Sequence, residues 1–285
     1  MRVAMVTCQE LPEPDTDEAL YAPALREFGI DAELAAWDSE RVKWARYDLC
    51  VLRSPWNYYT QVGEFLAWVE RVAATTRLLN PAPVIAWNVH KSYLLELERQ
   101  GIPITPTVLV RRGETTSLQD IVRERGFGTV VVKPAVSAGS YRTEKVGTLP
   151  QERAAGEAHL RALVAERDAL VQPYLRAVEG TGERAVVCID GRPTHAVRKS
   201  PRFGADAERV SQATPVSPAE SEFARKVLAC VDTPEPLLYA RVDLVRDDEG
   251  ALRLMELEVV EPSLFLQQHP PALRRFAAAV AARLK

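Results

Sequence analysis

The sequence predicts an α/β domain followed by two α+β lobes, and three observations support this fold class. First, strand and helix patterns alternate over residues 1–86, which favours a βαβ arrangement with a small parallel sheet. Second, the later strands end in polar loops or form hairpins, which is typical of antiparallel sheets. Third, the chain has 285 residues, of which 47% are apolar and 26% charged, so it can bury more than one core.

In the N-terminal domain, residues 1–86, helical spacing and turn residues define the elements. One helix ends at Gly29, and the next has Phe65 and Val69 on one face. The segment Asn80-Pro81-Ala82-Pro83 marks the domain boundary. The expected strands are 3–8, 31–37 and 48–52, and the expected helices are 19–28 and 62–74.

In the central lobe, residues 87–175, one helix ends at Gly101 and one apolar strand ends at Lys133-Pro134. In the C-terminal lobe, residues 176–285, Asp190-Gly191 predicts a tight hairpin. The expected central elements are helices 91–100, 118–125 and 150–165 and strands 107–110, 129–132 and 169–172. The expected C-terminal elements are strands 184–190 and 194–199, a mobile loop 203–217, helix 218–231, a hairpin over 239–258 and helix 272–284.

Composition limits the function classes. The net charge is −3 with Lys and Arg dispersed, so nucleic-acid binding is not expected. No apolar stretch reaches transmembrane length, and the apolar N-terminal run is too short for a signal peptide, so we expect no membrane contact. None of the four cysteines belongs to a Cys-x-x-Cys pair, which favours buried thiols in a reducing cytoplasm.

The C-terminal hairpin carries an unusual set of charges. Arg241 and Asp243 share one face of a strand, and Glu256 and Glu258 share one face of the next. If the turn spans Asp247 to Gly250, all four lie on the same side. Such carboxylates repel one another unless a cation joins them, and oxygen ligands of this kind suit Mg²⁺. The same alternation also occurs on an ordinary solvated strand face, and other segments decide between the two.

Two segments point to a nucleotide. The strand ending at Lys133 runs into the small residues Ser137-Ala138-Gly139-Ser140, whose backbone N–H groups could approach phosphate oxygens. A second strand leaves its sheet through Gln172-Pro173-Tyr174-Leu175, where free backbone groups could meet an adenine edge. Neither segment matches a P-loop or a Gly-x-Gly-x-x-Gly fingerprint.

The order of these features resembles the ATP-grasp superfamily, in the branch of glutathione synthetase and D-alanine–D-alanine ligase. The resemblance runs from about Trp87 to the C-terminus and implies a pre-grasp domain, a central lid and a C-terminal domain that grip ATP between two lobes. It implies Mg²⁺ ligands at Asp243, Glu256 and Glu258, and Arg241 at the transferring phosphoryl group or the acyl phosphate. Lys199, at the end of a strand, is a second catalytic candidate, because another cation would offset the charge of the triphosphate. The resemblance further implies that the nucleotide contacts are Lys91, Lys133, Ser137, Ala138, Gly139, Ser140, Gln172, Pro173, Tyr174, Leu175 and Glu183. One departure is visible: the family usually has Glu-x-Asn where this chain has Glu256-x-Glu258.

A narrower resemblance concerns a small ATP-grasp group that includes D-cycloserine synthetase, which closes O-ureido-D-serine into a ring. It rests on four segments: Arg53-Ser-Pro-Trp-Asn-Tyr58, Trp87-Asn-Val-His-Lys91, His195-Ala-Val-Arg-Lys199 and Glu256-Leu-Glu-Val-Val-Glu261-Pro. This resemblance implies antibiotic biosynthesis and an amino-acid-like substrate. Homodimers are common among such ligases, although nothing in the sequence fixes the oligomeric state.

Five residues are candidates for substrate contact. Arg53 follows a strand at its C-terminal end, where ligands bind in open α/β sheets, and could bind a substrate carboxylate. Trp56 and Tyr58 could line the substrate pocket, although aromatic residues more often pack in a core. His195 could contact substrate or be a structural histidine, and Glu261 could orient a substrate amine.

The implied reaction is ATP-dependent C–N bond formation through an acyl phosphate, with release of ADP and phosphate. Loops 137–140 and 203–217 are candidate lids that exclude water. Joining of two molecules, as in an amino-acid or peptide ligase, is an alternative to ring closure. Two other classes also remain open: a nucleotide-binding sensor without turnover, and an acyl-adenylate former that releases AMP.

Overall fold

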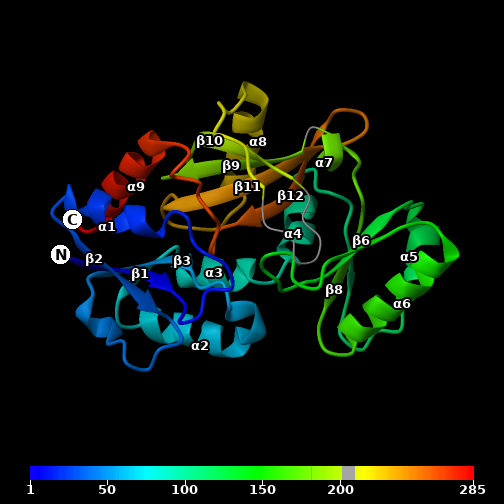
Figure 1. Cartoon of the computed structure of the whole chain (residues 1–285), viewed down its shortest axis with the longest axis horizontal. Helices are drawn as coiled ribbons and strands as arrows, with labels where there is room; N and C mark the ends of the chain where they lie inside the picture. Colours follow the sequence, from blue (N-terminus) through cyan, green and yellow to red (C-terminus); the bar gives the residue numbers. More distant parts are fainter. Residues whose placement is uncertain (181, 201–208) are drawn as a thin grey trace.

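A computed structural model describes residues 1–180, 182–200 and 209–285. Within these ranges the chain forms three four-stranded sheets, with a parallel sheet at the N-terminus and two antiparallel sheets after it (Figure 1). None of the described helices is long and apolar enough to cross a membrane.

The N-terminal sheet has the order β2-β1-β3-β4 and is parallel throughout. One face packs on helix α2, where Phe65, Trp68 and Val69 meet residues of β1 and β3. The other face packs on α1, which lies beside the C-terminal helix α9 in Figure 1. The elements are β1 (Arg2–Thr7), α1 (Glu18–Arg26), β2 (Asp31–Ala36), β3 (Leu49–Ser54), α2 (Val62–Ala73), β4 (Arg77–Leu79), α3 (Ala82–Asn88), α4 (Tyr93–Arg99) and two short 3₁₀ helices (Trp44–Arg46 and Tyr58–Thr60).

The C-terminal sheet has the order β10-β9-β11-β12, with every neighbouring pair antiparallel. Alternate residues of β9 enter two different cores: Ala185 and Val187 face the N-terminal domain and α9, whereas Val186 and Cys188 face α4 and α8. The elements are β9 (Glu183–Ile189), β10 (Arg192–Lys199), α8 (Pro218–Ala229), β11 (Tyr239–Arg246), β12 (Leu252–Glu258) and α9 (Pro270–Arg283).

The central lobe has its own core. Its sheet, in the order β5-β8-β6-β7, is covered on one face by α5 and α6, and the buried residues of this core all lie between Val110 and Val171. The opposite face is turned toward the rest of the molecule, as Figure 1 shows. The elements are β5 (Val108–Val110), α5 (Leu118–Arg125), β6 (Val130–Pro134), β7 (Glu144–Val146), α6 (Pro150–Val164), β8 (Ala169–Pro173) and α7 (Ala177–Gly180).

The expected fold class is confirmed by this arrangement, and the differences concern short elements. The sequence did not predict β4, α3, β7 or α7, because segments of three to seven residues carry too little periodicity to be recognised. The helix expected to begin at Lys91 begins at Tyr93. Residues 201–208 lie outside the described residues, and with them most of the first half of the expected loop 203–217. The described remainder forms bridges from Val210 and Thr214 to β10.

Two buried asparagines join the N-terminal domain to β11 and β12. The Asn80 amide donates to the carbonyl oxygens of Tyr239 (2.9 Å) and Val259 (2.7 Å). The Asn88 amide donates to the Leu257 carbonyl oxygen at 2.8 Å, and its side-chain oxygen accepts from the Val259 N–H at 3.1 Å. The segment between the first two domains is therefore fixed to the strand that carries the predicted metal ligands.

Candidate active site

A cavity of about 1200 Å³ lies between the open face of the central sheet and the C-terminal sheet. Val131 and Lys133 of β6 and Gln172 of β8 form one wall, because the alternate residues of these strands are used in the lobe's own core. Glu256 and Glu258 of β12 form the opposite wall. The N-terminal domain contributes Pro12, Glu13, Trp56 and Tyr59 to one end. All three parts of the chain therefore meet at this cavity.

The charged wall follows from strand register. Arg241 lies opposite Glu258 and Asp243 opposite Glu256, so the four charged residues share one side as expected. The turn is one residue longer than expected, because Arg246 pairs with Leu252. A bulge between Asp243 and Leu244 separates this polar end of the hairpin from the regular apolar pairs beyond it.

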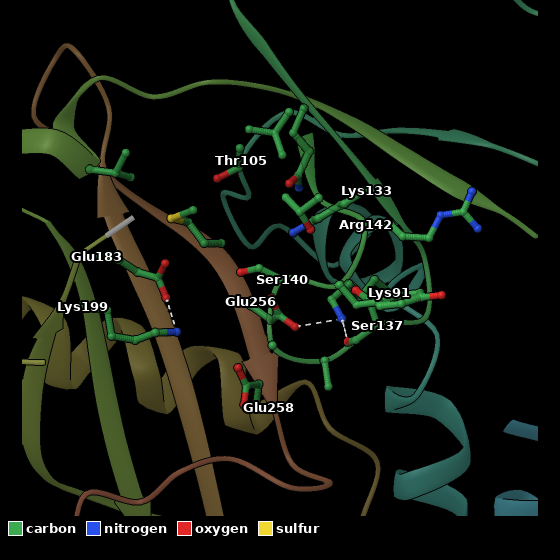
Figure 2. Close-up of a pocket in the computed structure, with 18 of the residues that line it drawn as sticks. Lys91, Thr105, Lys133, Ser137, Ser140, Arg142, Glu183, Lys199, Glu256 and Glu258 are labelled. Carbon is green, nitrogen blue, oxygen red and sulfur yellow. Dashed lines mark hydrogen bonds and ion pairs between the residues drawn. The ribbon is translucent and has the colours of Figure 1, made fainter. Parts of the chain in front are cut away.

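Each carboxylate of this wall is paired with a cation of the protein. Arg241 donates two hydrogen bonds to Asp243, at 2.8 and 2.9 Å, and also contacts Glu258. Lys199 lies 3.0 Å from Asp243 and 2.9 Å from Glu183, and Figure 2 shows the second of these contacts. The wall is therefore a continuous network of alternating charges.

The network shifts the pKa values of its members in different directions. Burial raises the pKa of Glu183 to about 7 and that of Glu258 to about 8, although Lys199 and Arg241 oppose the change. Burial also acts on Asp243 and Glu256, but nearby cations outweigh it, so both have pKa values below the usual range. For Asp243 these cations are Arg241 and Lys199. Arg241 and Lys199 therefore do not fully stabilise the ionised forms of Glu183 and Glu258.

This acid excess fits a bound Mg²⁺. Glu256 and Glu258 face the cavity, and their oxygen atoms are of the type that Mg²⁺ prefers. Asp243 is only 1% exposed and lies behind them, held by Arg241 and Lys199. In the part of the chain that the structure describes, no three His, Cys, Asp or Glu side chains are already arranged as a metal cage. Mg²⁺ commonly binds through one or two carboxylates plus phosphates, so a complete protein cage is not required.

Two lysines face this acidic wall. Lys91 contacts Glu256 at 3.1 Å and donates to the Ser137 carbonyl oxygen at 2.7 Å, so it connects β12 to the loop after β6 (Figure 2). Lys133 reaches into the cavity from β6 in the same view. Burial lowers the pKa of Lys133 below its ordinary value. Within the described ranges, the Lys133 amine has neither a hydrogen bond nor an ion pair, so it is able to bind an anionic ligand.

The loop after β6 borders the cavity with small residues and unusual backbone angles. Ser137, Ala138, Gly139 and Ser140 all line the cavity. Gly139 (φ 57°), Ser140 (φ 62°) and Arg142 (φ 49°) have left-handed backbone conformations. Turns of this kind can point consecutive N–H groups at an anion. Loop and lysines together provide a positive surface opposite the carboxylates.

The far end of the cavity suits an aromatic base. Gln172, Pro173, Tyr174 and Leu175 line it together, as the sequence predicts for the adenine contact. Glu183 also lines the cavity and forms its ion pair with Lys199.

Three predicted substrate residues do not line the cavity. Arg53 is 1% exposed and donates to the Tyr21 hydroxyl (2.9 Å) and to the Pro262 carbonyl oxygen (2.6 Å), so it cannot reach a substrate carboxylate. Tyr58 is 3% exposed, and burial raises its pKa well above the ordinary value. His195 is buried beside His269, with Nε2 donating to the Leu264 carbonyl oxygen at 3.1 Å. Of the five substrate candidates, only Trp56 and Glu261 lie at the cavity.

Several cavity residues were missed. Tyr59 faces the cavity while Tyr58 is buried, because consecutive residues of a 3₁₀ turn point in different directions. Tyr141 lines the cavity and its ring centroid lies 4.7 Å from that of Tyr59. Lys145 is on β7, which the sequence did not predict, and its Nζ lies 3.7 Å from the centroid of the Tyr174 ring. Proximity to the predicted motifs was the only available signal for Tyr59 and Tyr141.

Comparison with known proteins identifies relatives for the whole chain. The family described as D-cycloserine synthetase DcsG, N-terminal domain, matches residues 3–80. Cycloserine biosynthesis protein DcsG of Streptomyces lavendulae is 32% identical over 297 aligned positions, covering 99% of both chains. A crystal structure of D-cycloserine synthetase DcsG superposes with a TM-score of 0.91 at 31% identity and covers 100% of both chains.

More distant relatives share the architecture. D-alanine–D-alanine ligase of Actinobacillus pleuropneumoniae serotype 5b is 29% identical over 166 positions, which cover 55% of this chain and 52% of that protein. A D-alanine–D-alanine ligase structure from Bacillus anthracis, 14% identical and covering 100% of this chain and 98% of that one, gives a TM-score of 0.67. A RimK-domain ATP-grasp protein from Sphaerobacter thermophilus, 16% identical and covering 99% and 98%, gives 0.69. At these identities, the two structures support the fold alone.

Proposed function

Because this chain belongs to the family of D-cycloserine synthetase DcsG, within the ATP-grasp superfamily, we propose that it is an ATP- and Mg²⁺-dependent ligase that closes O-ureido-D-serine into a ring. The four cysteines are free thiols, and three of them are buried, which supports a cytoplasmic location. The substrate is a small molecule, and a homodimer stays a prediction.

The position of Lys133 is the structural observation that most supports the binding of ATP in this proposal. Its amine has no partner among the described side chains and faces carboxylates across a cavity large enough for a nucleotide and a small substrate. A lysine without an anionic partner is unfavourable in such a place unless a ligand supplies the anion. The triphosphate of ATP would supply the anion that Lys133 lacks, and Mg²⁺ at Glu256 and Glu258 would supply a cation to the carboxylates of the opposite wall.

The residues have distinct roles in the proposed reaction. Lys91 and Lys133 orient the phosphates, and the loop Ser137 to Ser140 closes over them. Glu256 and Glu258 would hold Mg²⁺, which would supply positive charge to the phosphoryl group during transfer. Arg241, which contacts Asp243 and Glu258, is assigned the stabilisation of negative charge on the transferring phosphoryl group or the acyl phosphate.

The reaction then proceeds in two bond exchanges. The substrate carboxylate displaces ADP from the γ-phosphoryl group and becomes an acyl phosphate. A nitrogen of the same substrate attacks the acyl carbon, the C–N bond forms, and phosphate leaves with the electron pair of the broken C–O bond. Water must be excluded between these steps, because it would hydrolyse the acyl phosphate.

The test is to incubate the protein with Mg-ATP and O-ureido-D-serine and to identify the nucleotide and the organic product by mass spectrometry. ADP, phosphate and a cyclised product are expected. AMP and pyrophosphate would identify an adenylate-forming enzyme, and tight ATP binding without turnover would identify a sensor. Parallel incubations with pairs of amino acids test for an intermolecular ligase, which would release ADP only when two amino acids are present.

A further inference from the structure

Glu261 differs from the other carboxylates that the C-terminal lobe presents to the cavity. Glu183 is paired with Lys199, Glu256 with Lys91 and Glu258 with Arg241. Glu261 also lines the cavity and is half-buried, yet in the ranges described by the structure it forms no ion pair. A half-buried carboxylate without a cationic partner in the protein is expected either to pair with a cationic group of the ligand or to take a proton from the ligand.

The position of Glu261 is fixed by the N-terminal domain. Trp56 Nε1 donates to the Glu261 carbonyl oxygen at 3.0 Å, and Arg53 donates to the carbonyl oxygen of the next residue, Pro262, at 2.6 Å. The Tyr58 hydroxyl lowers the pKa of the Glu261 carboxyl, so the two groups face each other. Arg53 and Trp56 therefore fix the backbone of the segment Glu261-Pro262. The Glu261 carboxylate then lies at the end of the cavity that also contains Trp56 and Tyr59.

From this geometry, and resting on the proposed function, we propose that Glu261 is the general base of the second step. As the substrate nitrogen forms its bond to the acyl carbon and phosphate departs, the proton on that nitrogen passes to the Glu261 carboxylate. The proton then leaves to solvent when the product is released, which restores the carboxylate. Atoms and charge balance without any additional reactant.

The environment of Glu261 suits proton exchange near neutral pH. Burial and Glu256 raise the pKa of Glu261, whereas Lys91, the Tyr58 hydroxyl and Arg241 lower it, and the resulting value is about 7. These groups come from the turn before α4, the 3₁₀ turn, β12 and β11. A general base is most effective when its pKa is close to the working pH.

The closing experiment separates the two steps in the Glu261→Gln variant. The wild type and variant are incubated with Mg-ATP and O-ureido-D-serine, with and without hydroxylamine, which attacks an acyl phosphate without help from a base and yields a hydroxamate. We expect the variant to form the cyclised product about 100-fold more slowly and to form the hydroxamate within about 3-fold of the wild type. Glu249→Gln, which removes an exposed glutamate from the β11–β12 turn, should behave as the wild type.

The pH profile gives a second readout. The wild-type kcat should fall with an apparent pKa near 7 on the acid side, and this limb should be absent from the residual activity of Glu261→Gln. In Tyr58→Phe, loss of the hydroxyl that lowers the Glu261 pKa should move the limb to higher pH. Tyr58→Phe also keeps the aromatic ring, so it serves if Glu261→Gln does not fold.

Each contrary outcome has a distinct meaning. Unchanged cyclisation in Glu261→Gln would overturn the assignment. A raised KM with unchanged kcat would also overturn it, because Glu261 would then be a carboxylate that binds the substrate ammonium group. Equal loss of the hydroxamate would overturn it as well, because Glu261 would then act in the first step. If the wild type releases no ADP with this substrate, the proposed function fails and this inference fails with it.

Discussion

Lys133 and Glu256 define the two sides of the cavity at the scale of single residues. The lysine has no described partner, whereas the glutamate is held by Lys91. Binding of a metal–nucleotide complex would give the Lys133 amine an anionic partner, and it would replace Lys91 as the cationic partner of Glu256. Lys133 has no protein ion pair to break on binding, and Glu256 exchanges one cation for another. Neither residue therefore needs a large conformational change.

Substitution of either residue should abolish ADP formation without unfolding the protein. We expect Lys133→Ala and Glu256→Gln to reduce the rate of ADP release by about 100-fold or more, because each removes a charge that acts on the transferring phosphoryl group. A coupled ADP assay measures the rate, and circular dichroism verifies the fold. Lys226→Ala, which removes an exposed lysine from α8, is the control and should keep wild-type activity. Unchanged turnover in either cavity variant would contradict the site assignment.

His195 predicts an acid-dependent loss of stability. Burial and the neighbouring His269 lower its pKa from 6.5 to about 4. The unfolded chain therefore takes up a proton as the pH falls below about 6.5, and the folded protein takes it up only near pH 4. This contribution to stability is complete above pH 6.5 and decreases as the pH falls, by as much as about 3 kcal/mol. Urea unfolding at pH 7.0, 6.0 and 5.0 should show a steeper decrease for the wild type than for His195→Gln; equal slopes would disprove the assignment.

At the scale of elements, the central lobe depends on a close approach between α6 and β7. A Cβ atom added at Gly156 of α6 would lie 2.5 Å from Cγ1 and 2.6 Å from Cγ2 of Val146 on β7. At Gly63 of α2, by contrast, an added Cβ atom would meet no atom within 4 Å. The two positions are therefore a matched pair, in which the same substitution has opposite consequences.

Gly156→Ala should destabilise the protein by about 1–3 kcal/mol, because the added methyl group forces the helix away from the strand. Gly63→Ala should be neutral or stabilise by up to about 1 kcal/mol, since alanine restricts the unfolded chain. Thermal unfolding followed by circular dichroism measures both. Equal effects of the two substitutions would show that the α6–β7 contact is not tight in solution.

The longer elements and the charged hairpin could be predicted from the sequence, and the reasons are physical. Strand alternation places Arg241 and Asp243 on one face of β11, and Glu256 and Glu258 on one face of β12. The pairing of the two strands depends also on the bulge between Asp243 and Leu244, which shifts the register by one residue and brings Asp243 opposite Glu256. The strand β4 could not be predicted, because its three residues are defined only by pairing with β3. The burial of Arg53 depends on Pro262, more than 200 residues away in the sequence, and no local pattern contains that contact.

At the scale of the whole molecule, one aromatic contact connects the N-terminal domain to the loop that borders the phosphates. The rings of Tyr59 and Tyr141 lie 4.7 Å apart, and both line the cavity. Val136, at the start of the same loop, packs against the core of the N-terminal domain. The loop is therefore held from the substrate side of the cavity.

Tyr59→Ala should release ADP in excess of the cyclised product, because a loosened loop admits water that hydrolyses the acyl phosphate. Tyr59→Phe keeps the ring contact and should retain a ratio of ADP to product near one. Both products are quantified in the same reaction by chromatography. A ratio near one in Tyr59→Ala would show that this contact does not protect the intermediate.

The separate core of the central lobe has a consequence for local stability. The N-terminal domain shares a continuous core with β9, β11 and α9, whereas the core bounded by Val110 and Val171 contains no residue from outside the lobe. A unit of this kind can open without disrupting its neighbours, so its backbone amides should exchange with deuterium sooner than those of β1 or β11. Mg-ATP, which would contact both lobes, should slow that exchange in β6 and β8 most of all, and mass spectrometry of peptides from these strands would measure the delay.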